Sequence, residues 1–323
     1  MSLSVLIKRV KVYPPIYKIR QWFTPERRRL FWRVITFGSL VLVIFGAIYA
    51  LQEIPKAEIE VNPLFLGVAF AVYALSYVMH LFGWHSLATL TFGHLPFRDN
   101  VEAVAASDLV KYLPTVAWYI ANRVHFYDQR QIKKGAVVAA SLLEMVALLG
   151  TGIVLYFVFW LNKIDSWLVV LIVILILAVI PKFIGPKVMN WWHTRITSHQ
   201  IVRGKQPQHW INAIFWYGIS WFAGGLILAT TLRTFVPINV NDYIPLLNMW
   251  LLAGLFGTIV SLSVGTIGIA REATLTFMLA QYWPLPASIA TAVSIKLILM
   301  FGQVVCALII LGLLRLIKRK NNE

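Results

Sequence analysis

Long apolar segments alternate with short polar segments along most of this chain. About 20 consecutive apolar residues cross a bilayer core as an α-helix. Apolar runs of this kind predict full spans at residues 31–51, 64–92, 135–160, 167–180, 212–232 and 286–314. We therefore expect an all-α integral membrane protein, a polytopic helical bundle of about 6–8 spans.

Two further apolar segments are interrupted, and both predict a pair of short helices. Residues 101–124 contain Pro114, and residues 244–283 contain Gly265 and Gly268. Proline and glycine both interrupt helices. The two ends of each segment are expected on the same side of the membrane, so each segment is either a re-entrant hairpin or a tightly joined pair of spans. Two such hairpins, one from each face, are typical of inverted-repeat transporters.

The distribution of charge supports a membrane protein and sets its orientation. The 323-residue chain is 59% hydrophobic and 13% charged, about half the charged fraction of a soluble domain. Of its 29 Lys and Arg, nine lie in residues 1–33, six in 92–134, five in 181–211 and four in 315–320, while the alternate loops hold one each. This is the positive-inside pattern. It explains the net charge of +16 by anionic lipid, and no nucleic-acid partner is expected.

The same pattern divides the chain into three regions. Residues 1–30 form a basic cytoplasmic N-terminal arm, residues 31–315 the transmembrane domain, and residues 316–323 a basic cytoplasmic tail. A multi-pass protein with both termini in the cytoplasm follows. The single cysteine, Cys306, excludes an intramolecular disulfide.

Four charged residues lie inside predicted apolar segments. Arg271 and Glu272 follow the glycine break, Lys296 lies ten residues into the last span, and Glu144 lies nine residues into the third. A charge at the bilayer centre costs about 2.5–3.5 kcal/mol on insertion scales, so such residues are candidates for function. Two interpretations stay open: Glu144 pairs with Lys296 or Arg271 and only holds the bundle together, or these groups line a polar cavity that meets a lipid head group.

A second group of candidates surrounds Pro114. It consists of Asp108, Lys111, Tyr112 and Arg123. If the segment is helical up to the proline, Asp108 and Lys111 share a face and can pair. The alternative is an amphipathic helix on the cytoplasmic surface, with Lys111 and Arg123 contacting lipid phosphates.

Motifs for other chemistry are missing from the sequence. The seven histidines show no metal-ligand spacing, and the Gly265 to Gly268 stretch lacks the Gly-Lys-Ser/Thr of a P-loop. We expect no metal, no cofactor and no nucleotide hydrolysis.

These motifs resemble the flippase-like transmembrane domain of the lysylphosphatidylglycerol synthetases, the bacterial multiple peptide resistance factors, and its stand-alone relatives. One element of that family resembles Lys111, Tyr112, Leu113, Pro114, Trp118 and Arg123, and a later glycine-rich element resembles Val264 to Gly268 with Arg271 and Glu272. The resemblance covers roughly residues 30–315 and implies a lipid translocase in a bacterial-type plasma (inner) membrane.

This chain departs from the family pattern at several positions. Thr115 replaces a glycine, Val264 a proline and Thr266 a glycine, and one extra residue follows Gly268. The resemblance therefore implies the fold rather than a shared substrate. The chain ends at Glu323, so the aminoacyl-transferase domain of the full synthetases, and with it lysyl transfer, is not expected.

The sequence thus predicts a flippase or translocase for a phosphate-bearing, anionic membrane lipid. Arg271, Lys296 and either Lys111 or Arg123 would compensate the phosphate, while Glu144, Asp108 and Glu272 would hold those cations. Gly265, Gly268 and Pro114 would interrupt the helices or act as hinges between them. The alternatives are an intramembrane lipid-modifying enzyme, such as a polyprenyl-phosphate or phospholipid transferase with Glu144 or Asp108 as general base, and a non-transporting scaffold. The lipid, the direction and energy source of transport, and a homo-oligomeric state stay open.

Overall fold

A computed structural model describes residues 61–109, 116–161, 207–264 and 269–320, together with residues 48 and 52. Every regular element in these residues is helical, as the sequence predicts. The elements are α4 (Leu64–Phe92), α5 (Phe97–Asp108), α6 (Val116–Asp128), α7 (Lys134–Leu161), α9 (Pro207–Arg233), the 3-10 turn η1 (Val240–Asp242), α10 (Tyr243–Val264), α11 (Ile269–Leu279) and α12 (Leu285–Lys320).

Five of these segments are long and apolar enough to cross a membrane. They are Leu64–Phe92, Lys134–Trp160, Gln208–Arg233, Val240–Val260 and Leu285–Ile317. Four of them coincide with the spans predicted at 64–92, 135–160, 212–232 and 286–314. The predicted spans at 31–51 and 167–180, and the arm at 1–30, lie outside the described residues.

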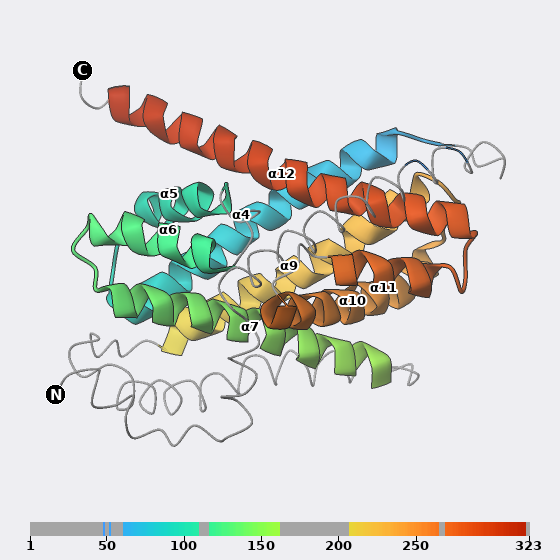
Figure 1. Ribbon diagram of the computed structural model, residues 1–323, viewed down its shortest axis with the longest axis horizontal. Coiled ribbons are helices and arrows are strands. Elements are labelled where there is room, and N and C mark those ends of the chain that lie inside the picture. The colour runs from blue at the N-terminus through green and yellow to red at the C-terminus, as the bar shows by residue number, and fades with distance from the viewer. Residues whose placement is uncertain are drawn as a thin grey trace, which may run out of the picture.

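The long helices run side by side and define two ends of the bundle (Figure 1). At one end, the Asn62 end, α4 begins and α9 stops, where the backbone N–H of Asn62 donates to the Thr234 carbonyl at 2.9 Å. At the other, the Phe92 end, α4 stops and α7 and α9 begin, beside the short helices α5 and α6. Among the described helices, α4 and α9 share the most extensive contact.

Both interrupted segments form the predicted pairs of helices. α5 ends at Asp108 and α6 begins at Val116, and α10 ends at Val264 and α11 begins at Ile269. Pro114, Gly265 and Gly268 lie between these bounds, outside the described residues. α5 packs on α6, and α10 packs on α11. The number of membrane crossings and the re-entrant character of either pair stay predictions.

Local sequence sets several helix ends. Asn62 accepts from the backbone N–H of Leu64 through Oδ1 at 3.2 Å and so assists the start of α4. Gly93 ends α4 at a φ of 89°, in the left-handed region that glycine adopts without strain. Asn239 and Asp242 form a reciprocal capping box just before α10.

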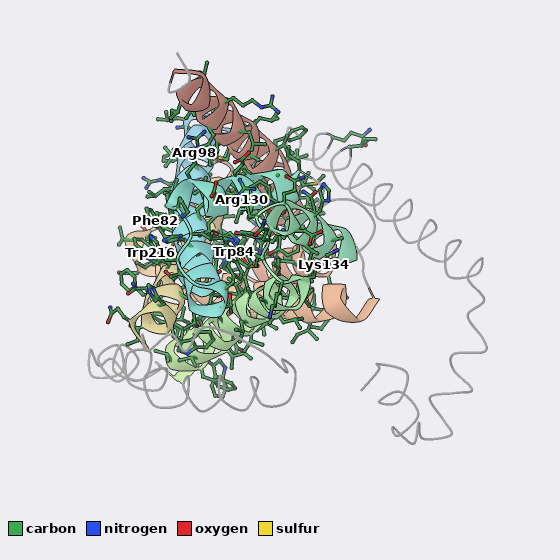
Figure 2. All side chains as sticks on the ribbon, turned by 90° about the vertical axis from the view of Figure 1, so that its left-hand side faces the viewer. Phe82, Trp84, Arg98, Arg130, Lys134 and Trp216 are labelled. Carbon is green, nitrogen blue, oxygen red and sulfur yellow. The ribbon has the colours of Figure 1, made fainter. Side chains whose placement is uncertain are left out.

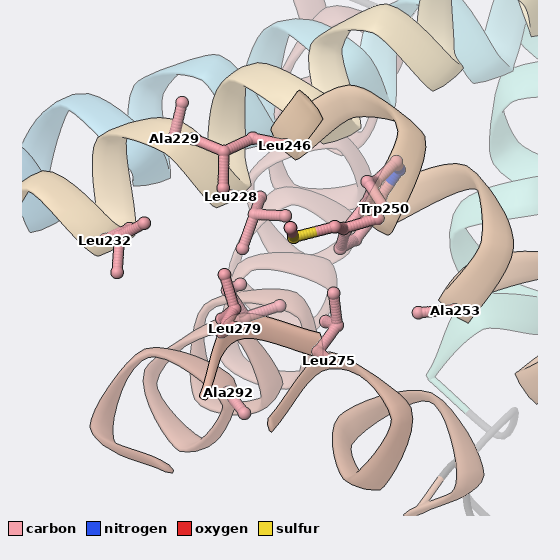
Figure 3. Close-up of a cluster of buried hydrophobic side chains, with 11 residues drawn as sticks. Leu228, Ala229, Leu232, Leu246, Trp250, Ala253, Leu275, Leu279 and Ala292 are labelled. Atoms are coloured by element: carbon pink, nitrogen blue, oxygen red, sulfur yellow. The ribbon is translucent and has the colours of Figure 1, made fainter. Parts of the chain in front are cut away.

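The largest described core cluster lies toward the Asn62 end (Figure 3). It joins four helices through the buried side chains of Leu228, Ala229, Leu232, Leu246, Met249, Trp250, Ala253, Leu275, Leu279, Ala292 and Ile295. Leu275 is on α11, shortly after Arg271 and Glu272, and Ile295 is on α12, directly before Lys296. This packing therefore holds the helix segments that carry these three charged residues.

Candidate functional site

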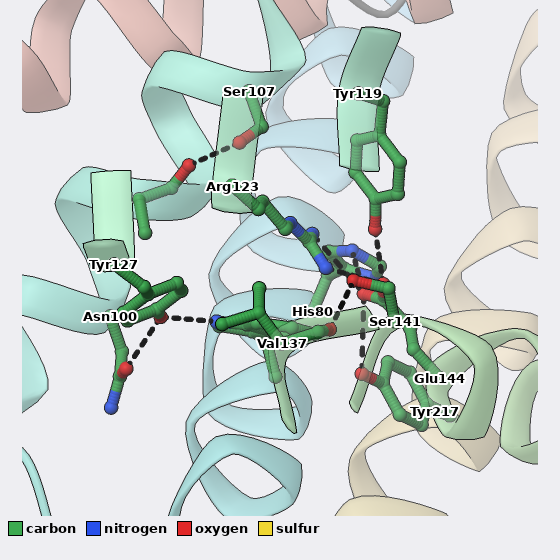
Figure 4. A network of polar contacts seen from close by, with 12 residues as sticks. His80, Asn100, Ser107, Tyr119, Arg123, Tyr127, Val137, Ser141, Glu144 and Tyr217 are labelled. Carbon is green, nitrogen blue, oxygen red and sulfur yellow. Dashed lines mark hydrogen bonds and ion pairs between the residues drawn. The ribbon is translucent and has the colours of Figure 1, made fainter. Parts of the chain in front are cut away.

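The carboxylate of Glu144 on α7 gathers donors from three other helices (Figure 4). Arg123 Nη1 donates to Oε2 at 2.6 Å and Nη2 to Oε1 at 3.5 Å, while His80 Nε2 lies 3.2 Å from Oε1. Tyr217 also donates to Oε1, at 3.4 Å, and Tyr119 donates to Oε2. A buried carboxylate with this many donors is held in its charged form. We call Glu144, Arg123, His80 and the nearby Asp108 the Glu144 centre.

Arg123 is fully enclosed, although it belongs to a short helix. Its guanidinium carbon lies 3.7 Å from the ring centre of Trp84 and 4.1 Å from that of Tyr119. Two aromatic faces therefore hold the cation in position. Its Nε has no hydrogen-bond partner among the described residues, so one donor of the guanidinium stays available.

The Glu144 centre lies deep in the bundle. Glu144 is ten residues from the start of α7, and His80 is twelve residues from the end of α4, which at 1.5 Å per residue places them about 15 and about 18 Å from the Phe92 end. A bilayer core is about 30 Å thick. Because Arg123 of α6 reaches Glu144 directly, α6 reaches the middle of the long helices.

Gly83 on α4 makes room for Tyr217 of α9. A Cβ at position 83 would lie 2.8 Å from Cε1 of the Tyr217 ring, closer than van der Waals contact allows. The absence of a side chain here lets the ring cross α4 and bring its hydroxyl to Glu144.

Asp108 lies at the end of α5, buried beside the same group. It interacts electrostatically with Arg123 and with the hydroxyl of Tyr77. Its Oδ2 has no hydrogen-bond partner among the described residues. Two carboxylates, Asp108 and Glu144, therefore surround one permanently charged guanidinium.

A second hydrogen-bond network supports Trp84 and includes Tyr127 and Asn100, which are labelled in Figure 4. Trp84 Nε1 donates to the Tyr127 hydroxyl at 2.9 Å, and that hydroxyl donates to Asn100 Oδ1 at 2.6 Å. Asn100 Nδ2 lies 2.8 Å from His85 Nδ1. Since Asn100 is on α5 and Tyr127 on α6, the network fixes both short helices against α4.

The second charged group lies between α11 and α12. Glu272 Oε1 accepts from Arg271 Nη2 at 2.5 Å and lies 3.7 Å from Lys296 Nζ. Glu272 and Lys296 are buried, and Arg271 is partly exposed, with Trp250 on one side of its guanidinium. We call Arg271, Glu272 and Lys296 the Lys296 centre.

Gly257 allows α11 to approach α10 at this centre. A Cβ at position 257 would lie 2.7 Å from Arg271 Cβ and 3.1 Å from its backbone nitrogen. Lys296 is eleven residues from the start of α12, or about 16 Å from the Asn62 end. The Lys296 centre thus lies about as far from the Asn62 end as the Glu144 centre lies from the Phe92 end.

The Phe92 end, which faces the viewer in Figure 2 with Arg130 and Lys134 labelled, carries an outer set of ion pairs. Arg130 binds Asp99 at 3.1 Å and Glu102 at 3.4 Å, and Lys134 binds Asp128 at 3.2 Å. These pairs are at least partly exposed and contribute little to stability. These pairs connect α5, α6 and α7 near their ends, and we do not regard them as a ligand-binding site.

The structure brings together six of the eight predicted binding residues, in two separate groups. Arg271, Glu272 and Lys296 lie together, and Asp108, Arg123 and Glu144 lie together. The predicted pairing of Glu144 with Lys296 or Arg271 is wrong, because α6 inserts Arg123 against Glu144 while Glu272 binds both other cations. The surface interpretation of Arg123 is also wrong, since this side chain is 0% exposed.

Several predicted positions lie outside the described residues. They are Lys111, Tyr112, Pro114, Gly265 and Gly268. The predicted pairing of Asp108 with Lys111 is therefore not tested.

The sequence interpretation missed the partners that complete the Glu144 centre. These are His80, Trp84, Tyr119 and Tyr217. Only His80 carries a signal that could have found it, since an ionisable residue in the middle of an apolar span is a candidate for function. The aromatic residues look like ordinary residues of an apolar helix.

Comparison with known proteins yields no relative: no family model, no curated protein and no solved structure matches this chain. The resemblance to the flippase-like domain stays a prediction from the motifs.

Proposed function

We propose that this protein is a membrane carrier that binds the phosphate of an anionic lipid head group at the Lys296 centre and moves it across the bilayer. The observation that carries the proposal is the charge of that centre. Two cations, Arg271 and Lys296, share one carboxylate, Glu272. Among the described residues, this centre therefore contains two cations and one carboxylate, inside apolar helices where charge is costly. A lipid phosphate carries the negative charge that attracts these cations.

The exposure of Arg271 supports this assignment. Lys296 and Glu272 are buried, whereas the Arg271 side chain is 23% exposed. A guanidinium binds phosphate oxygens in a bidentate manner. Arg271 is therefore the first contact of the head group, and Lys296 adds a second charge behind it.

The two broken helix pairs give the carrier its architecture. We infer that α5 with α6, and α10 with α11, are re-entrant hairpins that enter from opposite faces, in a bundle of about 6–8 spans. Re-entrant backbone is tolerated where it is buried in protein, and the enclosure of Arg123 fits this condition. The same architecture is what the resemblance to the flippase-like domain implies, in a bacterial-type plasma membrane with the Phe92 end toward the cytoplasm.

The enzymatic alternative with Glu144 as the general base is weaker. A general base needs a lone pair directed at a substrate proton. The oxygens of Glu144 are occupied by Arg123, His80 and two tyrosines. Such a carboxylate holds neighbouring side chains in place and is poorly suited to accept a proton from a substrate.

Reconstitution into vesicles tests the proposal. The measurement is the rate at which a fluorescent anionic phospholipid moves between leaflets, for wild type, Arg271→Ala, Lys296→Ala and Arg233→Ala. Either of the first two changes removes one of the two cations that contact Glu272, so transport is expected to fall at least about tenfold. Arg233 lies at the end of α9 over the Phe65 ring and serves as the matched control, with transport close to wild type.

Two results would overturn the assignment. Wild-type transport rates in both Arg271→Ala and Lys296→Ala would show that the Lys296 centre is not needed for transport. A wild-type protein that moves no head group, while folding and inserting normally, would favour a scaffold whose charges only hold the bundle together.

A further inference from the structure

We propose that Trp221 on α9 is the gate between the Lys296 centre and the Phe92 end of the carrier, so that a head group passes only when its indole moves aside. The inference rests on the proposed function, because the gate controls the movement of the head group named there. It assigns the barrier to an uncharged side chain.

One face of α9 connects the two charged centres. Tyr217, whose hydroxyl donates to Glu144, and Gly224 are seven residues apart and therefore share a face. The Trp250 ring fills the space beside Gly224, and the centre of that ring lies 5.5 Å from the guanidinium carbon of Arg271. Seven residues of helix extend about 10 Å. The two centres are thus about two turns apart along α9.

Trp221 lies between these two positions on the same face of α9. It follows Tyr217 by four residues and precedes Gly224 by three, a spacing that keeps all three residues on one face. It is fourteen residues from the start of α9 and twelve from its end, or about 21 and about 18 Å. The indole is therefore near the middle of the bundle, between the depths of the two centres.

Two glycines let the indole fit between α7 and α10. A Cβ at position 152 on α7 would lie 2.8 Å from Cζ2 of the ring, and one at position 254 on α10 would lie 2.6 Å from Cζ3. Gly254 lies between Trp250 and Gly257, two residues of α10 that contact Arg271. The ring therefore packs on α10 next to Arg271, on the side of this residue that faces the Glu144 centre.

A hydrogen bond anchors the indole to α7. Nε1 of Trp221 donates to the carbonyl oxygen of Leu148 at 3.0 Å. Leu148 lies inside α7, where a carbonyl also accepts from the backbone N–H four residues later. Breaking the indole bond therefore leaves this carbonyl satisfied. The Trp221 side chain is only partly buried, so the ring has room to move.

A gate and a packing residue respond in opposite directions when the side chain is made smaller. If Trp221 only holds the core together, a smaller side chain loosens the helices around Arg271 and slows transport. If the indole is the barrier, a smaller side chain without the Nε1 donor opens the route more often and speeds transport.

Transport by variants of Trp221 tests the inference. The movement of a fluorescent phosphatidylglycerol between leaflets is measured in vesicles that contain the full chain, for wild type, Trp221→Phe and Trp221→Leu. Trp216→Phe is the matched control, because Trp216 is on the same helix but stacks on Phe82 rather than lying between the centres. The affinity for dihexanoyl phosphatidylglycerol, kept below the concentration at which it forms micelles, is measured in detergent alongside.

We expect the transport rate to rise about fivefold in both Trp221 variants, the factor that corresponds to one hydrogen bond. The affinity for the short-chain lipid should stay within about twofold of wild type, because Arg271 and Lys296 are unchanged. Trp216→Phe should transport at the wild-type rate.

A wild-type or lower rate in both Trp221 variants, in vesicles where wild type transports, would overturn the gate and leave the proposed function standing. A rise that Trp216→Phe shares would also overturn it, because such a rise reflects a general loosening of the helices. Absence of transport by the wild type would instead overturn the proposed function, and the gate with it.

Discussion

Glu144 shows how much a single buried residue depends on its partners. Its carboxylate is 2% exposed and binds Arg123, which is 0% exposed. Neither group has water to replace a lost partner. The presence of the pair therefore adds little net stability, because the cost of burying two charges offsets their attraction. Removing one partner destabilises the protein strongly, because the other charge remains buried and unpaired.

Glu144→Gln should accordingly destabilise the protein by about 3–5 kcal/mol. The measurement is thermal unfolding in detergent, followed by intrinsic fluorescence. Glu102→Gln is the matched control, since Glu102 pairs with Arg130 at the surface and is 39% exposed; its loss should cost less than about 1 kcal/mol. Equal effects of the two changes would contradict the buried pair.

The triple variant Arg123→Met, Glu144→Leu and Asp108→Asn separates stability from function. Asp108 also interacts with Arg123, so all three charges are removed together, and stability should return to within about 1 kcal/mol of wild type or rise above it. Transport that also returned to the wild-type rate would show that the pair has only a structural role.

Gly83 offers a second test at the residue scale. Gly83→Ala would place a methyl group 2.8 Å from the Tyr217 ring, so we expect about 1–3 kcal/mol of destabilisation from overpacking. Gly67→Ala on the same helix meets nothing within 4 Å and should stabilise α4 by up to about 1 kcal/mol. The comparison is again made by thermal unfolding. If both changes stabilise the protein, Tyr217 does not pack across α4 as described.

The helices differ in how far the sequence predicts them. The apolar runs predict α4 and α7 to within a residue or two at each end. The predicted breaks at Pro114, Gly265 and Gly268 lie outside the described residues. Length and composition are enough for this, because each helix satisfies its own backbone hydrogen bonds within the membrane.

The pairing of charges could not be predicted in the same way. Whether Glu144 meets Arg123 or Lys296 depends on which helices are neighbours, and that follows from packing between segments distant in sequence. Gly83 and Gly257 show the difficulty: each permits a close approach, yet in the sequence neither differs from the glycines that face open space. The two charges that are adjacent in sequence, Arg271 and Glu272, were expected together and are found together.

At the scale of the whole molecule, the arrangement predicts which loops share a side of the membrane. In a Cys306→Ala background, single cysteines replace His94, Gln131, Val240 and Tyr282, all of which are exposed. A membrane-impermeant maleimide applied from one side should label positions 94 and 131 together, because α5 and α6 return to the Phe92 end. Applied from the other side, it should label positions 240 and 282. Labelling of 94 and 131 from opposite sides would show that α5 and α6 cross the membrane once.

The length of α12 has a consequence for the bilayer around the protein. Its 36 residues extend about 54 Å, far beyond a hydrocarbon core of about 30 Å. The helix must tilt or protrude, and Figure 1 shows it running obliquely along the bundle. Acyl-chain length then sets its inclination, and with it the reach of Lys296 toward Glu272. If the protein transports lipid as proposed, transport rates measured in vesicles of graded thickness should therefore pass through an optimum, so that lipid composition would itself regulate the transport rate.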